Sequence, residues 1–209
     1  MNLKNIFSEL FEALDKLDHD REEILKISRT IIRECSIAIK HIHRKEFELC
    51  HEKINSIRDG HRELISLVNR NPGYFFKYLK TPEQEFAEAI TFYSIVSKDE
   101  LPNPKELGID PLNYVFGLAD LVGELRRYVL DNIRNSQIKD LNYILEIMDE
   151  IYTQLFTVDY PSGLTQDLRQ KTDRARSIIE KTRGDISISL QMNELKTCIE
   201  KNSNLKKNL

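Results

Sequence analysis

Apolar residues recur at helical spacing along almost the whole chain of 209 residues. Intervals of three and four residues predict amphipathic helices, because a strand would alternate apolar and polar positions. The expected helices cover, in order, residues 3–14, 19–42 with or without a continuation to 57, 82–96, 110–134, 137–156, 163–183 and 190–201. The pattern predicts an all-α, single-domain bundle of about seven helices over residues 1–201, with a flexible tail at 202–209.

Two proline-containing segments predict where helices begin. In Thr81-Pro-Glu-Gln84, Thr81 suits the N-cap, Pro82 the first helical position, and Gln84 completes a capping box. Asp110-Pro111 repeats the order of a capping residue followed by proline. We therefore expect one helix to start near residue 82 and another near residue 111.

Glycine and proline also predict where helices end or pack closely. Asn71-Pro-Gly73 is the first firm break in the apolar pattern, and Gly184 predicts the end of a helix. Gly123 falls in the middle of the helix that follows Pro111. Because a glycine inside a helix costs about 1 kcal/mol relative to alanine, we expect close approach of a neighbouring backbone there.

The composition fits long helices: 31% of residues are charged, with only 7 Gly and 6 Pro. A net charge of −3 argues against a wholly basic nucleic-acid binder, although a basic face remains compatible with it. Cys35, Cys50 and Cys198 lack a CxxC partner, so we interpret them as reduced core residues. Neither a signal peptide nor an apolar run of about 20 residues is present, which predicts a soluble, cytoplasmic protein with no membrane contact.

Two pairs of acids occupy helix positions that are flanked by apolar residues. Glu85 and Glu88 are three residues apart, and Asp120 and Glu124 are four apart, so each pair shares a helix face. The plain interpretation is a solvated, charged face. If the two helices pack together, four carboxylates converge on one site that suits Mg²⁺, with Mn²⁺ as the alternative. Such a cation activates water and stabilises charge on a phosphoryl group.

A row of basic residues and a run of aromatic residues are the candidates for contacts with nucleic acid. The row, at helical spacing, comprises Lys26, Arg29, Arg33, Lys40, His43 and Arg44. Nearby glutamates leave open a salt-bridged surface instead of phosphate contacts. In Tyr74-Phe-Phe-Lys-Tyr78-Leu-Lys80, aromatic residues and lysines are interleaved, which serves either core packing or base stacking. The preferred phosphate contacts are Lys26, Arg29, Arg33, Lys77 and Lys80.

Several segments resemble one known family. Leu112-Asn-Tyr-Val-Phe-Gly-Leu-Ala-Asp120-Leu-Val-Gly-Glu124-Leu-Arg-Arg is similar to the most recognisable segment of the translin/Trax family. Gln84-Glu85-Phe-Ala-Glu88-Ala and the segment from Asp18 to Arg29 resemble Trax more than translin. Lys181-Thr-Arg-Gly184 resembles the family's closing region, and the similarity extends from about Phe7 to Glu200.

The resemblance implies a fold, an activity and a site. Members of the family are seven-helix proteins that assemble into hollow octamers. The translin–Trax complex is a Mg²⁺-dependent endoribonuclease on single-stranded RNA that removes the passenger strand during RNA silencing. Trax supplies its catalytic carboxylates and translin mainly assembly and RNA binding. By motif, Glu85, Glu88 and Asp120 match the catalytic acids of Trax, and Glu124 is the neighbouring fourth.

The chain also departs from eukaryotic Trax, since it starts at its first helix without a basic extension. This resembles a compact prokaryotic, archaeal-type member, for which we expect a homo-oligomer, an octamer by analogy, outside eukaryotic silencing. A hetero-oligomer with a translin-like chain is the alternative assembly, and single-stranded DNA the alternative ligand. Two other functions stay open: a non-catalytic nucleic-acid-binding scaffold, and an all-α nucleoside-triphosphate pyrophosphohydrolase that also gathers acids around Mg²⁺.

Overall fold

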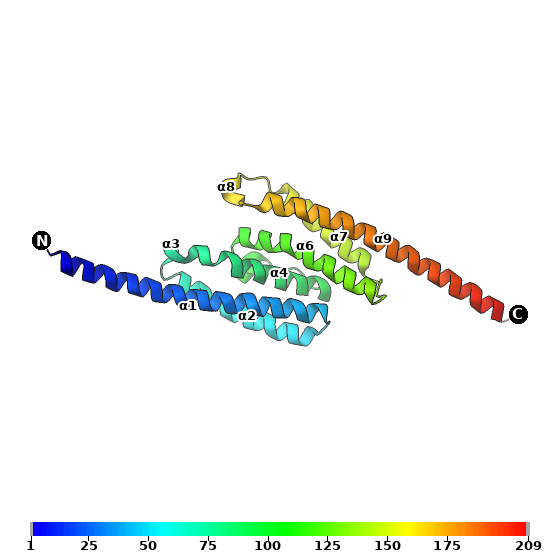
Figure 1. Ribbon diagram of the computed structural model, residues 1–209, viewed down its shortest axis with the longest axis horizontal. Coiled ribbons are helices and arrows are strands. Elements are labelled where there is room, and N and C mark those ends of the chain that lie inside the picture. The colour runs from blue at the N-terminus through cyan, green and yellow to red at the C-terminus, as the bar shows by residue number, and fades with distance from the viewer. Residues whose placement is uncertain (1, 208–209) are drawn as a thin grey trace. The chain divides into compact units, whose positions relative to one another are not determined.

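The computed structural model describes residues 2–207, and the side chains of residues 2–201. The regular structure in this part of the chain is entirely helical, which confirms the all-α prediction (Figure 1). Six helices have 17 or more residues: α1 (Leu3–His43), α2 (Phe47–Val68), α4 (Lys80–Ser97), α6 (Pro111–Arg134), α7 (Leu141–Thr157) and α9 (Leu168–Lys207). The short elements are α3 (Pro72–Phe75), η1 (Phe76–Tyr78), α5 (Pro104–Leu107) and α8 (Ser162–Thr165).

The chain forms two compact units, Met1–Gly117 and Leu118–Leu209, and α6 passes from the first into the second. In the first unit, α1 packs along both α2 and α4 (Figure 1). The apolar stripe expected on α1 is its buried face, with Ile24, Ile31, Cys35, Ala38 and Ile42 all at most 1% exposed. The helices that α1 packs on, α2 and α4, also bury apolar side chains, among them Ile54, Ile57, Leu64, Phe86 and Ile90.

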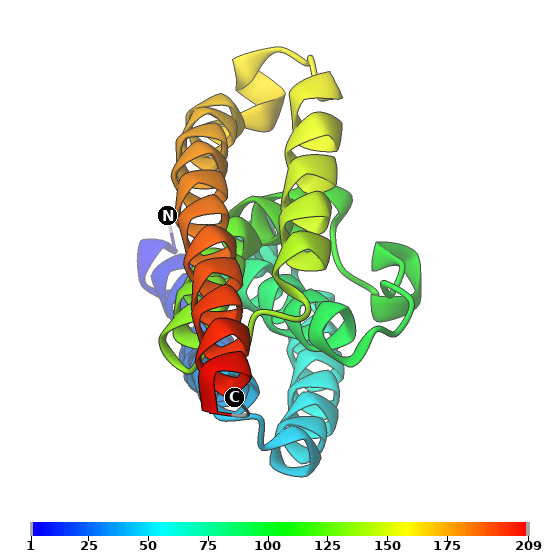
Figure 2. The same cartoon turned by 90° about the vertical axis from the view of Figure 1, so that its right-hand side faces the viewer.

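In the second unit, α7 and α9 run side by side in opposite directions and are joined through α8 (Figure 2). The buried side chains of this unit come from the later part of α6, from α7 and from α9; they include Leu125, Val129, Ile144, Met148, Leu168 and Ile179. Packing of amphipathic faces, rather than helix propensity, stabilises helices of this kind.

The boundary expected between residues 14 and 19 is wrong, because α1 is continuous from Leu3 to His43. The sequence pattern leaves open whether the helix continues past residue 47, and the structure has a break there between α1 and α2. The chain turns at Lys45, which adopts a left-handed conformation with φ 61°. The Lys45 N–H donates to Ile42 O and the Glu46 N–H to His41 O, the two bonds of a Schellman motif. Glycine usually occupies this position, and here it is lysine, so no glycine marks the end of the helix. The break expected at residues 71–73 is present as well, between α2 and η1.

The end predicted at Gly184 is wrong, because α9 continues through it to Lys207. Contacts on both sides of Gly184 hold the helix: Arg183 binds Asp149 at 2.7 Å, and Arg126 binds Asp185 at 2.9 Å. Two expected helices are therefore one. The segment predicted as a tail at 202–209 is helical as far as Lys207, and its last two residues lie outside the described residues.

The capping box predicted for α4 is wrong, and the N-cap predicted for α6 is confirmed. The chain enters α4 from η1 with Leu79 already in helical conformation (φ −77°, ψ −28°), so the helix begins at Lys80 without a side-chain cap. Thr81 lies inside the first turn. In α6, by contrast, Asp110 Oδ1 accepts from the backbone N–H of Leu112 at 2.9 Å, as an N-cap should.

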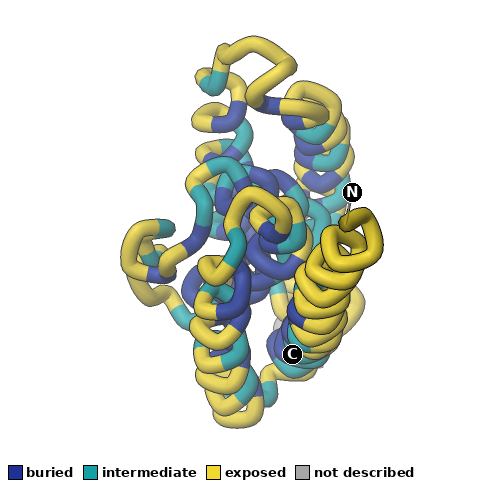
Figure 3. The backbone as a smooth tube through the Cα atoms, turned by 90° about the vertical axis from the view of Figure 1, so that its left-hand side faces the viewer, coloured by how far each residue is buried: buried dark blue, intermediate teal, exposed yellow. Residues whose placement is uncertain are grey.

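The cysteine prediction holds for two residues of three. Cys35 and Cys50 are buried free thiols, and Cys198 is exposed. Cys198 lies on the last turns of α9, whose apolar residues Ile188, Met192, Leu195 and Ile199 are all more than half exposed. The first turns of α1 are likewise exposed (yellow near the N-terminus in Figure 3).

Candidate functional site

The first pair of predicted site residues lies on α4, which packs on α1. Glu85 is half-buried, and Glu88 is 9% exposed. The negative charges of both carboxylates act on the pKa of the buried Cys35 thiol on α1. Burial raises the pKa of Cys35 well above its usual range, and the charges of Glu85 and Glu88 raise it further. The two acids therefore lie next to the α1–α4 contact, as their apolar neighbours in the sequence indicate.

The close backbone approach expected at Gly123 occurs at Gly117 instead. A Cβ atom added to Gly117 would lie 2.6 Å from Gln84 O, 2.6 Å from Ala87 Cβ and 3.0 Å from Glu88 N. At Gly123, a Cβ atom would meet no described atom within 4 Å beyond its own stretch of helix. Gly117 therefore lets the first turns of α6 lie directly on the turn of α4 that carries the acids.

The second pair of predicted site residues, Asp120 and Glu124, follows Gly117 on α6. Each of the two carboxylates lies next to a positively charged side chain. Lys171 Nζ, on α9, donates to both oxygens of Asp120, at 2.5 and 2.8 Å. Glu124 Oε2 lies 3.6 Å from Arg127 Nη1, one turn further along the helix. The side chains of Asp120 and Glu124 are 30% and 26% exposed. Asp120 thus presents both carboxylate oxygens to one cationic group.

Sequence reasoning missed two residues of this region, Lys171 and Glu83. Lys171 lies 51 residues after Asp120 in the chain, so local spacing gives no signal for their contact. In the sequence, Glu83 is only one residue of a predicted helix start. In the structure its side chain is buried, with 1% of its surface exposed. It lies 3.1 Å from His61 Nε2 and accepts hydrogen bonds from Asn113 and from the backbone of Asp110. A buried carboxylate needs such partners.

The oxygen donors of the four acids suit a hard divalent cation, and the ammonium on Asp120 shows that this carboxylate binds positive charge through both oxygens. As the side chains are placed, the described residues contain no group of three or more His, Cys, Asp or Glu arranged to hold a metal ion. The predicted four-carboxylate metal site therefore stays a prediction.

The predicted phosphate contacts are mostly exposed. Lys26, Arg29 and Arg33 are exposed on α1, and Lys77 is exposed in η1. The salt-bridged alternative holds in part, because Arg33 Nε lies 3.8 Å from Glu34, which also binds Lys53 at 2.6 Å. Lys26 lines a groove of about 490 Å³ between α1 and α2 together with Glu23, Glu63 and Arg70.

Lys80 has a more buried position than the other candidates. Its Nζ lies 4.8 Å from the ring centroid of Phe116, which is within range of a cation–π contact. Of the aromatic residues that precede Lys80, one packs in the core and two are exposed to solvent. Phe75 is buried, whereas Tyr74 and Phe76 are 64% and 55% exposed, so these two rings are accessible for stacking.

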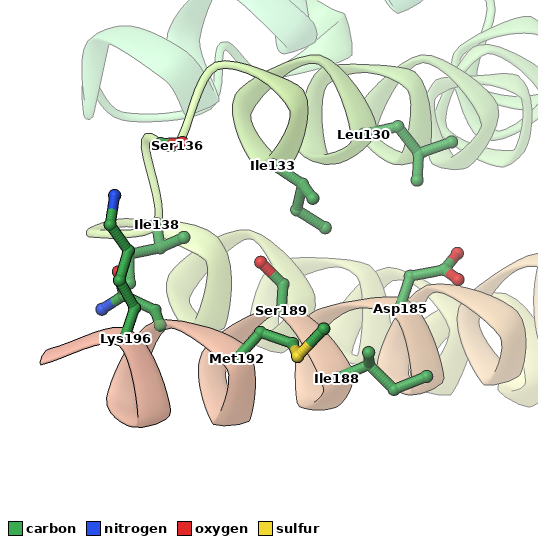
Figure 4. A pocket seen from close by; sticks show the side chains of 10 residues that line it. Leu130, Ile133, Ser136, Ile138, Asp185, Ile188, Ser189, Met192 and Lys196 are labelled. Carbon is green, nitrogen blue, oxygen red and sulfur yellow. The ribbon is translucent and has the colours of Figure 1, made fainter. Parts of the chain in front are cut away.

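A second groove, of about 450 Å³, lies in the second unit between the end of α6 and α9 (Figure 4). Leu130, Ile133 and Ile138 line one side, and Ile188 and Met192 on α9 face them. The acid in its lining, Asp185, is paired with Arg126. Its lining is largely apolar, which suits protein contact better than hydrolytic chemistry.

The fold matches that of solved C3PO proteins. The structure of the AfC3PO–duplex RNA complex aligns with a TM-score of 0.81 and 27% identity, over 89% of this chain and 97% of that one. Apo-NeC3PO aligns with a TM-score of 0.80 at 23% identity, over 90% of this chain and 97% of that one, and supports the fold alone.

Sequence comparison gives the family. The Translin family model matches residues 19–183, and the chain belongs to this family. It is 40% identical over 187 residues to an uncharacterized protein of Methanocaldococcus jannaschii, covering 87% of this chain and 82% of that protein. It is 24% identical over 186 residues to the translin-associated protein X homolog of Schizosaccharomyces pombe, covering 78% of each. Among the described residues, no helix is both long and apolar enough to cross a membrane.

Proposed function

We propose that this protein is a Mg²⁺-dependent endoribonuclease that cleaves single-stranded RNA. The observation that carries the proposal is the position of Glu88, a carboxylate 9% exposed on the turn of α4 where Gly117 allows α6 to pack. Membership of the Translin family and the similarity to translin-associated protein X support the same activity. A buried carboxylate suits a cation site, because a bound cation offsets the free-energy cost of burying the negative charge.

In this proposal Glu85, Glu88 and Asp120 hold the cation, Mg²⁺ or Mn²⁺, and Glu124 is a further ligand or the base that orients the attacking water. The cation, when bound, lowers the pKa of water and stabilises charge on the phosphoryl group. Lys171 has to release one or both oxygens of Asp120 for this. Once it has left Asp120, we expect the Lys171 ammonium to contact an RNA phosphate at the site.

RNA as the ligand is supported by the AfC3PO–duplex RNA complex and by the exposed groups of the first unit. Lys26, Arg29, Arg33 and Lys77 provide positive charge for phosphates. The rings of Tyr74 and Phe76 provide stacking surfaces for unpaired bases, and Lys80 lies at the start of the helix that carries the acids. Because unpaired bases can stack on exposed rings, we expect single-stranded RNA to be the ligand. Single-stranded DNA is the alternative ligand, since its bases and phosphates can contact the same side chains.

We propose further that the active form is a homo-oligomer. Two apolar stripes are exposed: one of Leu3, Ile6, Phe7, Leu10, Phe11 and Leu14 on α1, and one of Ile188, Met192, Leu195 and Ile199 on α9. Apolar patches of this extent on a surface mark protein contacts. An octamer is the assembly that we expect, and a translin-like second chain is the alternative partner.

The test is to incubate the purified protein with labelled single-stranded RNA, duplex RNA and single-stranded DNA, with Mg²⁺ and with a chelator, while its mass in solution is measured. Shortened oligonucleotides that require Mg²⁺ support the proposal. Release of pyrophosphate from free nucleoside triphosphates would instead identify a pyrophosphohydrolase. Tight RNA binding without cleavage would identify a scaffold, a function that the Lys171–Asp120 ion pair favours because the ammonium already neutralises that acid.

A further inference from the structure

The carboxylate of Glu83 joins three segments of the first unit. Its Oε1 lies 3.1 Å from Nε2 of His61 on α2. Its Oε2 accepts from Nδ2 of Asn113 and from the backbone N–H of Asp110, both at 2.9 Å. Glu83, His61 and Asn113 are at most 7% exposed. A buried carboxylate with three hydrogen-bonding partners is well satisfied, and the loss of it would leave all three without their acceptor.

The geometry at the start of α6 is that of a capping box in which the acid comes from another helix. In an ordinary capping box, a glutamate at the third helical position accepts from the N–H of the N-cap residue. Here the N-cap residue is Asp110 and the third position is Asn113, an amide that donates instead. Glu83 of α4 accepts both the N-cap N–H and the Asn113 amide. A negative charge at this end of a helix is also favoured by the helix dipole.

A second contact between the same helices lies about two turns further along α6. There Gly117 lies against Ala87 and the backbone of Glu88. Two contact points between α4 and α6 determine both the position and the rotation of the first turns of α6, because one contact alone would leave the helix free to pivot. Glu83 provides the first, polar contact, and Gly117 provides the second, apolar one.

We infer that Glu83 is a positioning residue for the proposed metal site, which makes this inference dependent on the proposed function. From α4, the helix that carries Glu85 and Glu88, Glu83 caps the first turn of α6, and Asp120 and Glu124 lie further along that same helix. His61 holds the Glu83 carboxylate from the opposite side, and its ring packs 5.5 Å from the ring of Phe86. Glu83 itself makes its contacts to protein groups and takes no part in binding the cation.

Three variants separate positioning from general stability. Glu83→Ala removes the acceptor for all three donors. Glu83→Gln keeps one oxygen for Asp110 and Asn113, and its amide nitrogen donates to His61 Nε2 in the tautomer protonated at Nδ1. Ile57→Ala creates a cavity in the core of the same unit and is the control for lost stability, since Ile57 is 1% exposed on α2 and takes no part in this network.

The experiment measures two quantities for each variant: the Kd for Mn²⁺ by titration calorimetry and the Mg²⁺ concentration for half-maximal RNA cleavage. We expect Glu83→Ala to raise both about tenfold or more, as removal of supporting partners does at metal sites. Glu83→Gln should stay within about threefold of the wild-type protein, and Ile57→Ala should match the wild type despite its lower Tm.

Equal Kd values for Glu83→Ala and Ile57→Ala would overturn the inference. If the wild-type protein binds Mn²⁺ and cleaves no RNA, the proposed activity fails, and the Kd values still decide the role of Glu83. If the wild-type protein binds no Mn²⁺, both proposals are overturned.

Discussion

Gly117 of α6 lies directly against Ala87 of α4, so closely that a Cβ atom on Gly117 would fall 2.6 Å from the Cβ of Ala87. The backbone oxygen of Gln84 lies at the same distance from that position, and a backbone atom does not move aside as a flexible side chain would. A residue with any side chain at 117 therefore has to shift one helix relative to the other.

Gly117→Ala should lower the free energy of unfolding by about 1–3 kcal/mol, the usual cost of overpacking. The matched control is Gly123→Ala, in the same helix. Since a Cβ atom there meets no described neighbour within 4 Å beyond its own helix, alanine should stabilise the protein by up to about 1 kcal/mol. Urea titrations of both variants check the opposite signs. A neutral Gly117→Ala would show that the two helices are not in close contact.

Lys171 should compete with a divalent cation for Asp120, because its ammonium binds both carboxylate oxygens. Lys171→Met removes the competing charge and keeps most of the side-chain length. We expect the Kd for Mn²⁺ to fall about threefold to tenfold, which corresponds to about 0.7–1.4 kcal/mol. The matched control is Arg176→Met on the same helix, whose guanidinium pairs with Glu180 at 3.1 Å. An unchanged Kd for Lys171→Met would exclude Asp120 as a ligand.

The three cysteines should react with thiol reagents very differently. Burial raises the pKa of Cys50 to about 12 and, with Glu85 and Glu88 adding to it, raises that of Cys35 well above its usual range. Because the thiolate is the reactive form, both residues should stay unlabelled in the native protein at pH 8, whereas exposed Cys198 reacts. Mass spectrometry should find one label per native chain and three after unfolding.

The same two thiols give a pH dependence of stability. Their pKa values are higher in the folded protein than in the unfolded chain, so the unfolded chain loses its protons first as the pH rises. Below the pKa of the unfolded thiol, about 8.5, each buried thiol makes its full contribution to the free energy of unfolding. As the pH rises above that value, the free energy of unfolding falls by up to about 1.4 kcal/mol per pH unit for each thiol. Unfolding titrations of the Cys35→Ser, Cys50→Ser double variant should show a shallower decline between pH 8 and 10.

Assembly should depend on the exposed stripe of α1. Phe11 is 59% exposed, and its ring lies 5.9 Å from that of Phe7. Phe11→Glu places a charge in the middle of the stripe and should convert the oligomer to smaller species by light scattering. Asn5→Glu adds the same charge on the opposite face of the helix and should leave the mass unchanged. Equal masses for the two variants would exclude this stripe as a contact between chains.

The periodicity of the sequence predicts helices because a long helix such as α1 buries one face, as the stripe from Ile24 to Ile42 shows; α4 differs, since its residues 86–92 are all buried. Helix ends were harder to predict. Lys45, Lys98 and Ser136 adopt left-handed conformations at positions where glycine is the usual signal. Gly184, which has that signal, lies inside a helix that ion pairs on either side of it stabilise.

Local spacing predicts that both pairs of candidate acids lie on helices, and they do, on α4 and on α6. It did not identify Lys171 or the role of Glu83, because the partners of these residues lie 22–51 positions away in the chain. It also selected Gly123 in place of Gly117. A glycine in a helix predicts close packing only when its face meets another helix, and this depends on the tertiary arrangement.

The central claim is that the carboxylates of α4 and α6 together support metal-dependent RNA cleavage. The most direct test compares Mg²⁺-stimulated cleavage of a labelled single-stranded RNA by the wild-type protein, Glu88→Gln and Asp120→Asn, with far-UV circular dichroism to confirm that each variant is helical. Each substitution should lower the cleavage rate by about 100-fold or more while the helical content is retained. Undiminished cleavage by both folded variants would contradict it.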